Sequence, residues 1–219
     1  LKQLRMDMNS YYEDTLYPLQ DKVLKVIDGL KTPFYLTGGT AISRCYYHFR
    51  YSDDLDFFVN NDRNFTDYCQ KIINAISKYN LEDSIRTDTY QSFFLEKKLK
   101  IDFINDVAYK LGKTNKHKIF SEIDNLENIL SNKISAVIGR DEPKDVVDIW
   151  IIAVNEKIDW KKIFLSVNSK AVGIFPPLIA ERLDTFPVNL LDKINWVEGK
   201  KPVRDKFLKD IQKIIKEII

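Results

Sequence analysis

The chain has 219 residues, of which 44% are hydrophobic and 30% charged, and its formal net charge is +2. This length suits one compact domain or two closely packed lobes, and the small net charge creates no global field that would select nucleic acid. No apolar run is long enough to span a bilayer and no signal peptide is visible, so we expect no membrane association.

The first third of the chain predicts a helix, a strand, a second helix and a second strand. Apolar residues recur at helical spacing over residues 10–30, and residues 34–37 form a short run of strand formers followed by two glycines. We expect Thr40 to lie at or near the N-cap of a helix over residues 41–49. Residues 55–59 predict the next strand.

The glycine pair and an aspartate pair predict the chemistry of this region. Free backbone N–H groups point outward at a helix N-terminus, so Gly38, Gly39 and Thr40 predict an anion-binding turn that can hold a triphosphate. Asp54 and Asp56 stand at positions i and i+2, so both carboxylates leave one face of the predicted strand. Mg²⁺ prefers carboxylate, phosphate and water oxygens, and two metal ions can stabilise the attacking and leaving oxygens of a displacement at phosphorus. A lone Asp-x-Asp or a lone Gly-Gly is weak, but together they predict nucleotidyl transfer from an NTP with Mg²⁺ or Mn²⁺.

Several other chemistries lack the residues that they need. The only two histidines are His48 and His117, so a zinc site of histidine and cysteine is not expected, and no Gly-x-Ser-x-Gly elbow or Gly-x-x-x-x-Gly-Lys loop occurs. Cys45 and Cys69 lie in apolar helical contexts without a Cys-x-x-Cys pair, which favours buried free thiols and a cytoplasmic location.

The middle of the chain predicts one more helix and two more strands. Residues 65–79 have the spacing of an amphipathic helix, residues 85–94 suggest one strand and residues 94–104 another. Asp102 falls between apolar neighbours in the last strand and lies either on a solvent-facing surface or in a site. Taken alone, its position favours solvent. Four lysines between residues 110 and 118 form a basic loop that either holds phosphates or is simply solvated.

The remainder of the chain predicts helices only. They cover residues 125–140, 143–155, 160–167, 176–186 and 203–218. The change in composition near residue 120 predicts a boundary between an α/β lobe, residues 1–120, and a helical lobe, residues 121–219. We therefore predict an α+β fold, with a mixed sheet flanked by helices and a C-terminal helical lobe.

A cluster of charges surrounds the corner between the first two of these helices. Lys133 and Arg140 are two helical turns apart and share a face, as do Asp145 and Asp148 at i and i+3. A tight corner would bring Lys133 near Asp148. The cluster is either part of an active site or a structural ion-pair network.

The two motifs together resemble the AbiEii/AbiGii-type nucleotidyltransferase toxin family, within the DNA polymerase β-like nucleotidyltransferase superfamily. The resemblance is carried by Gly-Gly-Thr-Ala-(apolar) followed by Arg-x-Ser-x-Asp-Leu-Asp-Phe-Phe. The matched positions are Gly38, Gly39, Thr40, Arg50, Ser52, Asp54 and Asp56.

The resemblance implies roles for residues whose position alone is ambiguous. Asp102 would be a third carboxylate that binds the second metal ion and takes the proton from an attacking hydroxyl. Lys133 would neutralise triphosphate charge, and Asp148 would orient Lys133 or the nucleotide. Arg50 would bind phosphate or lock the aspartate strand through a carboxylate pair, and Ser52 would support the turn before that strand.

The resemblance also suggests partners. It makes the 3′ end of tRNA a leading acceptor and a neighbouring antitoxin a partner. Two alternatives remain open at this point. The acceptor is a small molecule or a protein side chain, or the chain is a nucleotide-binding module without turnover.

Overall fold

In the computed structural model, which describes residues 8–219, the chain folds into two compact units. The first, here called the sheet unit, comprises the described residues up to Tyr46 with Tyr51–Val107 and Thr114–Asp124. The second, the helical unit, comprises Tyr47–Arg50, Ala108–Lys113 and Asn125–Ile219. Residues 1–7 of the predicted α/β lobe lie outside the described part, and the predicted lobe limits stay a prediction.

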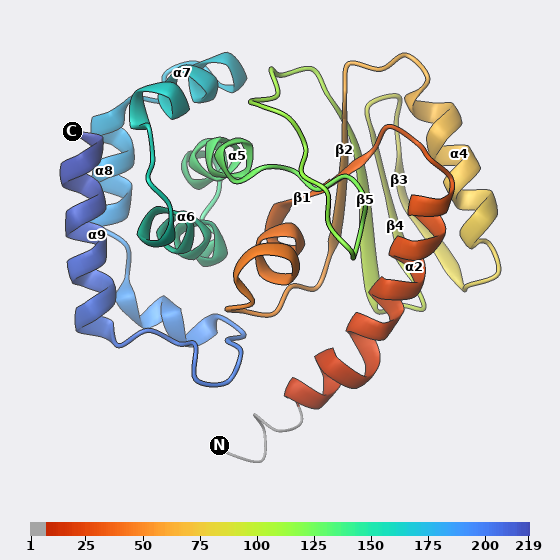
Figure 1. Cartoon of the computed structure of the whole chain (residues 1–219), viewed down its shortest axis with the longest axis horizontal. Helices are drawn as coiled ribbons and strands as arrows, with labels where there is room; N and C mark the ends of the chain where they lie inside the picture. Colours follow the sequence, from red (N-terminus) through yellow and green to blue (C-terminus); the bar gives the residue numbers. More distant parts are fainter. Residues whose placement is uncertain (1–7) are drawn as a thin grey trace. The chain divides into compact units, whose positions relative to one another are not determined.

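A five-stranded mixed sheet forms the sheet unit, in the order β1-β2-β5-β4-β3 (Figure 1). Its strands are β1 (Tyr35–Thr37), β2 (Leu55–Asn60), β3 (Leu81–Arg86), β4 (Tyr90–Leu95) and β5 (Leu99–Asp106). β2 and β5 run parallel, whereas the other neighbouring strands are antiparallel. Buried and part-exposed residues alternate along β2, so one face of the sheet packs into the core and the other carries polar side chains. The mixed sheet and the many helices confirm the predicted α+β fold.

Helices cover one face of this sheet. The helical turn η1 (Tyr12–Leu16) continues into α2 (Tyr17–Gly29), and α2 lies beside α4 (Phe65–Ile76) (Figure 1). Aromatic rings fill the space below them: Phe34 packs against Phe65 of α4 and against Phe103 of β5, with centroid separations of 5.9 and 5.1 Å. Phe57 stacks on Phe103 at 5.3 Å, which ties the two parallel strands to this core.

The prediction of one strand over residues 85–94 is wrong, because the chain turns back within that segment. The Thr87 hydroxyl accepts hydrogen bonds from the amides of Thr89 and Tyr90, at 3.3 and 2.9 Å, and closes a polar turn between β3 and β4. A second turn places Glu96 and Lys97 at φ of +52° and +55°, as a type I′ hairpin turn requires. β5 therefore begins at Leu99 and not at residue 94.

The helical unit confirms the predicted helices, with ends that differ by a few residues. They are α5 (Leu126–Gly139), α6 (Pro143–Asn155), α7 (Trp160–Lys170), α8 (Pro176–Asp184) and α9 (Arg204–Ile218). Within this unit α5 packs against α6 and α7, and α8 packs against α9 (Figure 1). A short 3-10 helix, η3 (Val188–Lys193), was not predicted. Among residues 8–219, no helix is both long enough and apolar enough to cross a membrane.

Candidate active site

The glycine turn links β1 to the next helix, as the sequence predicts. β1 ends at Thr37, and a short helical segment, α3 (Gly38–Thr40), leads into the π-helix η2 (Ala41–Tyr47). Thr37, with extended backbone angles, occupies the N-cap position, and Thr40 lies in the first turn, so Thr40 is near the N-cap, as predicted, but is not the cap itself. The hydroxyl of Thr40 instead donates to the carbonyl oxygen of Asp54, which fastens the glycine turn to the residue preceding β2.

Strand register brings two of the three predicted carboxylates together. Asp56 in β2 is the direct partner of Asp102 in the parallel strand β5, so their side chains leave the same face of the sheet. Asp56 is also the register partner of Thr37, the last residue before the glycine turn. Asp54 precedes β2 by one residue and is therefore not on the strand itself.

Gly38 lies directly against the carboxylate of Asp56. Its φ of +69° is a left-handed conformation that favours glycine. A Cβ at this position would lie 3.1 Å from Cγ of Asp56 and collide with Oδ2. Glycine is thus required both by the backbone angle and by the close approach of a carboxylate.

Asp102 is held by three polar neighbours that the sequence did not identify as site residues. It is 8% exposed, so the solvent-face interpretation of its position is wrong. Ser92 and Tyr90 of β4 donate to Oδ1 at 2.7 and 3.2 Å, and Lys100 donates to Oδ2 at 2.6 Å. Lys100 shares the face of Asp102 at spacing i−2 and was detectable from sequence, whereas Ser92 and Tyr90 depend on the pairing of β4 with β5.

The carboxylate oxygens of this cluster are of the chemical kind that a divalent metal ion prefers. Among residues 8–219, no three histidine, cysteine or acidic side chains are already arranged as a metal site. Mg²⁺ is commonly bound by one or two carboxylates together with substrate phosphates and water, which is the chemistry that Asp54 and Asp56 offer.

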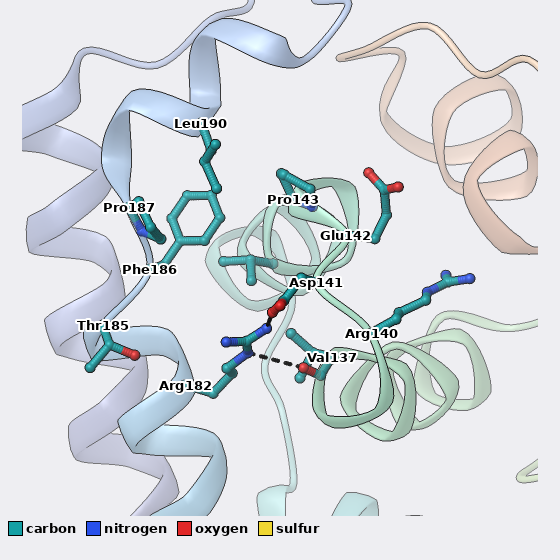
Figure 2. Close-up of a pocket in the computed structure, with 11 residues that line it drawn as sticks. Val137, Arg140, Asp141, Glu142, Pro143, Arg182, Thr185, Phe186, Pro187 and Leu190 are labelled. Carbon is teal, nitrogen blue, oxygen red and sulfur yellow. Dashed lines mark hydrogen bonds and ion pairs between the residues drawn. The ribbon is translucent and has the colours of Figure 1, made fainter.

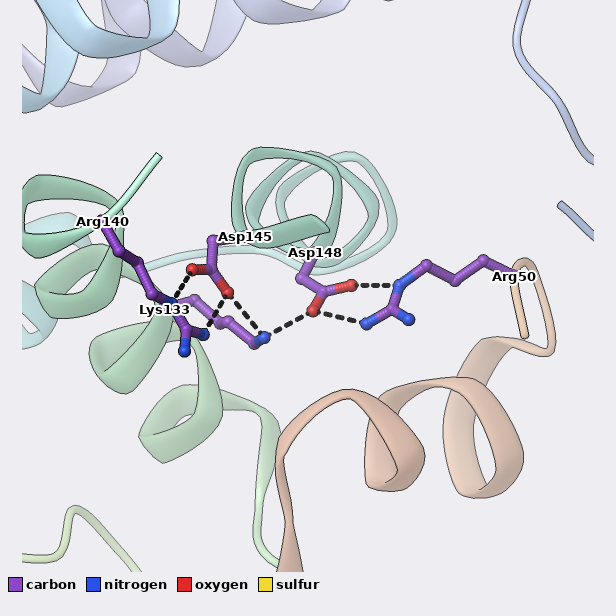
Figure 3. A network of polar contacts seen from close by, with 5 residues as sticks. All are labelled: Arg50, Lys133, Arg140, Asp145 and Asp148. Atoms are coloured by element: carbon purple, nitrogen blue, oxygen red, sulfur yellow. Dashed lines mark hydrogen bonds and ion pairs between the residues drawn. The ribbon is translucent and has the colours of Figure 1, made fainter. Parts of the chain in front are cut away.

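The second charged motif forms a buried network in the helical unit (Figure 3). Lys133 of α5 donates to Asp145 at 2.8 Å and contacts Asp148 at 2.7 Å, both in α6. Asp148 also receives two hydrogen bonds from Arg50, each of 2.8 Å, and Arg140 forks onto Asp145 at 2.7 and 3.0 Å. The sequence-based expectation that Lys133 lies near Asp148 is confirmed. The carboxylate that Arg50 holds belongs to α6 and not to the aspartate strand.

Burial and charge act in opposite directions on this network. Burial by itself would raise the pKa of Asp148, but Arg50 and Lys133 hold that pKa below its ordinary value. Burial would likewise lower the pKa of Lys133, but Asp148 and Asp145 raise it. Every member therefore remains charged near neutral pH, with three cations and two anions.

Ser52 is buried in the sheet unit and is fixed through its backbone. Its amide donates to the hydroxyl of Tyr17 at 3.3 Å, and its carbonyl oxygen accepts from Gln20 at 3.1 Å. These bonds position the segment that leads to Asp54, which agrees with a supporting role in the turn.

The helical unit also contains a cavity of about 380 Å³ beside the α5–α6 corner (Figure 2). Phe186, Pro187 and Leu190 form an apolar side of it, and the charged corner at Arg140 borders it. Arg182 lies in its wall, where it pairs with Asp141 and donates to the carbonyl oxygen of Val137 at 3.1 Å. Because that carbonyl belongs to the last turn of α5, Arg182 caps this helix.

Solved structures with the same fold include several nucleotidyltransferases. JHP933 from Helicobacter pylori matches with a TM-score of 0.58 and 18% identity, over 91% of this chain and 90% of its own. MenT4, a nucleotidyltransferase toxin from Mycobacterium tuberculosis H37Rv, matches with a TM-score of 0.57 and 13% identity, over 93% of this chain and 82% of its own. ANT(2″)-Ia in complex with adenylyl-2″-tobramycin matches with a TM-score of 0.54 and 14% identity, over 69% of this chain and 94% of its own. At these identities the similarity establishes the fold.

Sequence comparison establishes the family. No curated protein sequence matches the chain. The family profile described as nucleotidyl transferase AbiEii toxin, type IV toxin–antitoxin system, matches residues 23–215, which is most of the chain. The protein is a nucleotidyltransferase and belongs to the AbiEii toxin family.

Proposed function

We propose that this enzyme transfers a nucleotide from an NTP to an acceptor hydroxyl in a reaction that depends on Mg²⁺ or Mn²⁺. The observation that supports this proposal most is the register of the parallel strands, in which Asp56 lies directly opposite Asp102. Gly38 supports it further, because the glycine turn lies against the carboxylate of Asp56. Two carboxylates beside a glycine turn at the start of a helix suit a metal–triphosphate substrate.

Each candidate site residue in the sheet unit has a proposed role in this reaction. Asp54 and Asp56 bind the metal ion that accompanies the triphosphate, and the backbone of Gly38, Gly39 and Thr40 binds phosphate oxygens. Asp102 is a ligand of the second metal ion and accepts the proton of the attacking hydroxyl. Divalent ions, when bound, stabilise negative charge on the attacking and leaving oxygens.

The residues of the helical unit and the turn before β2 have proposed roles that follow the family. Lys133 neutralises triphosphate charge, Asp148 orients Lys133, and Arg50 fixes Asp148 by its two hydrogen bonds. Ser52 supports the turn that carries Asp54. The helical residues also form a structural network, so their variants need a stability measurement beside every activity measurement.

The proposed acceptor is the 3′ end of tRNA, and the proposed setting is the cytoplasm, with a cognate antitoxin. The family is one of toxins of type IV toxin–antitoxin systems, which supports the antitoxin. The fold is shared with ANT(2″)-Ia bound to adenylyl-2″-tobramycin, which keeps a small-molecule acceptor as the alternative. Transfer to a protein side chain and nucleotide binding without turnover are further outcomes that the experiment distinguishes.

The test is incubation of the enzyme with each labelled NTP and total tRNA, with Mg²⁺ or with EDTA. We expect label in tRNA from one or more NTPs, only with Mg²⁺ and not with the Asp56→Asn variant. Periodate-oxidised tRNA, which has lost its terminal diol, serves as the matched acceptor control and should take no label. Label in intact and oxidised tRNA alike would contradict the 3′ hydroxyl, and label in protein or small molecules alone would contradict tRNA.

A further inference from the structure

Lys100 forms an ion pair with Asp102, the candidate ligand of the second metal ion. Its ammonium group lies 2.6 Å from Oδ2 of Asp102, and its side chain is 33% exposed while that of Asp102 is 11% exposed. The two residues are two positions apart on β5, so they leave the same face of the sheet. The ion pair is therefore part of the face that carries the carboxylates.

The charge of Lys100 acts on more than one carboxylate. Burial by itself would lower the pKa of Lys100, but the hydrogen bond and charge of Asp102, together with the charge of Asp54, raise it. The ammonium group of Lys100 thus already compensates the negative charge of Asp102, where a divalent cation is proposed to bind.

The other oxygen of Asp102 is occupied as well. Ser92 and Tyr90 of β4 donate to Oδ1, so neighbouring strand residues hold both oxygens of this carboxylate. These neutral donors orient the carboxylate without adding positive charge. Of these three partners, Lys100 is the one that carries a positive charge, as a metal ion bound to Asp102 would.

We propose that Lys100 is a positioning residue that neutralises and holds Asp102 in the metal-free enzyme and competes with the divalent cation for its Oδ2. This inference rests on the proposed metal-dependent function. A divalent cation and an ammonium group on the same carboxylate oxygen repel each other at short range, and the double charge of the metal ion makes this repulsion stronger than that between two side-chain cations. Metal binding near Asp102 consequently requires that the ammonium group of Lys100 move away, where it can contact a phosphate oxygen of the nucleotide.

The neighbouring lysine provides a matched control. Lys98 lies two residues before Lys100 in the exposed turn between β4 and β5, and its amide donates to the carbonyl oxygen of Leu95. Lys98→Met removes the same charge from the same hairpin. It should change neither the metal affinity nor the basal activity.

The experiment is a calorimetric titration of Mn²⁺ into the full chain without nucleotide. Lys100→Met should bind Mn²⁺ more tightly than the wild type, on the order of tenfold, because a competing like charge is removed. Lys100→Arg retains the positive charge and should bind as weakly as the wild type. Circular dichroism checks each fold, and Lys100→Gln, which keeps a donor for Asp102 but no charge, replaces the methionine variant if that variant is unfolded.

The outcomes separate this inference from the proposed function. Unchanged or weaker Mn²⁺ affinity in folded Lys100→Met or Lys100→Gln, with normal binding by the wild type, would overturn only the role of Lys100. An equal increase in Lys98→Met would also overturn it, since the effect would then be one of general charge. If neither the wild type nor any variant binds Mn²⁺, the metal requirement and this inference are both wrong.

Discussion

At the scale of single residues, the site is defined by one close approach. Gly38 and Asp56 are not neighbours in the sequence. In the fold, however, the carboxylate of Asp56 occupies the space that a side chain at Gly38 would need. The left-handed φ of Gly38 adds a second constraint. Both constraints act on the same pair, so a substitution at Gly38 affects the fold and the metal-binding carboxylate together.

Gly38→Ala should therefore destabilise the protein and impair nucleotidyl transfer. A positive φ costs an alanine about 1–2 kcal/mol, and displacement of Asp56 adds to this cost. Urea unfolding measures the stability, and labelled-NTP transfer measures the activity. Gly29→Ala is the control, because nothing lies within 4 Å of its added Cβ and its φ is not in the left-handed range. Equal effects of the two substitutions would contradict this account.

Substitution of Asp56 and substitution of Asp102 should have different effects on NTP binding and on turnover. Asp56→Asn should impair both NTP binding and transfer, because its carboxylate is proposed to hold the metal ion of the triphosphate. Asp102→Asn should leave NTP affinity nearly intact and reduce turnover by about 10²–10⁴-fold, as loss of a general base typically does. NTP affinity and single-turnover rates of each variant and of the double variant provide the measurement. Wild-type turnover by a folded Asp102→Asn variant would remove Asp102 from the site.

At the scale of elements, the corner between α5 and α6 is held by buried charges rather than by apolar packing alone. Asp145 and Asp148 are fully buried, and their four carboxylate oxygens are shared among Lys133, Arg50 and Arg140. Such a network stabilises little relative to an apolar core, but the loss of one partner leaves a charge buried without compensation. The corner thus depends on its buried members, Arg50, Lys133, Asp145 and Asp148, more than on Arg140, whose side chain is 60% exposed.

Asp148→Asn should lower the free energy of unfolding by about 3–5 kcal/mol, since Arg50 would stay buried without its carboxylate. Asp141→Asn is the control at the same corner. Asp141 pairs with Arg182 at the surface, where its side chain is 88% exposed, so the effect should stay below about 1 kcal/mol. Urea unfolding measures the loss of unfolding free energy in each variant. Similar losses in the two variants would show that burial of the carboxylate does not decide how much stability is lost.

The contribution of Asp148 should also depend on pH in a predictable direction. Its pKa in the folded protein is lower than the ordinary value of 3.8 that the unfolded chain regains. Its stabilising effect is complete above that value and is lost as the pH falls through the lower folded-state pKa. The stability difference between wild type and Asp148→Asn should therefore be constant near neutral pH and shrink below about pH 4. Urea unfolding from pH 3 to pH 7 tests this, and a difference that grows on acidification would contradict it.

At the scale of the whole molecule, charge is organised locally and not as a general field. The net charge is only +2, and the carboxylates of the sheet unit and the ion pairs of the helical unit each lie within their own unit. An anionic substrate is therefore not attracted by the molecule as a whole. Its binding has to rely on specific phosphate contacts and on metal ions that offset Asp54, Asp56 and Asp102.

NTP binding should consequently require a divalent ion. Calorimetry with Mg²⁺ should show binding, and the same titration in EDTA should show affinity lower by roughly tenfold or more, because a bare triphosphate meets several carboxylates at short range. Asp56→Asn is expected to reduce the difference between the two conditions. Equal affinity with Mg²⁺ and with EDTA would contradict the metal requirement directly.

Local patterns in the sequence were sufficient to predict much of the fold and some of the contacts in the candidate site. The strand, the double glycine and the following helix were predicted from neighbouring residues, and α6 was predicted with the ends it has. The proximity of Lys133 and Asp148 followed from helical spacing across a tight corner. These predictions succeed because periodicity and turn chemistry act over a few residues.

The sequence by itself determined the family and the order of the elements outside residues 81–106 and 188–193, and it predicted the residues proposed to carry the chemistry. Only the tertiary structure decided that Asp56 faces Asp102, that Ser92, Tyr90 and Lys100 hold Asp102, and that Arg50 pairs with Asp148 across 98 residues of chain. The physical reason is that strand register and buried ion pairs join distant segments, and no local period encodes which segments meet. The polar turns at Thr87 and Glu96 show the same limit on a smaller scale. The first sets the pairing of β3 with β4, and the second sets the pairing of β4 with β5 and thereby the surroundings of Asp102.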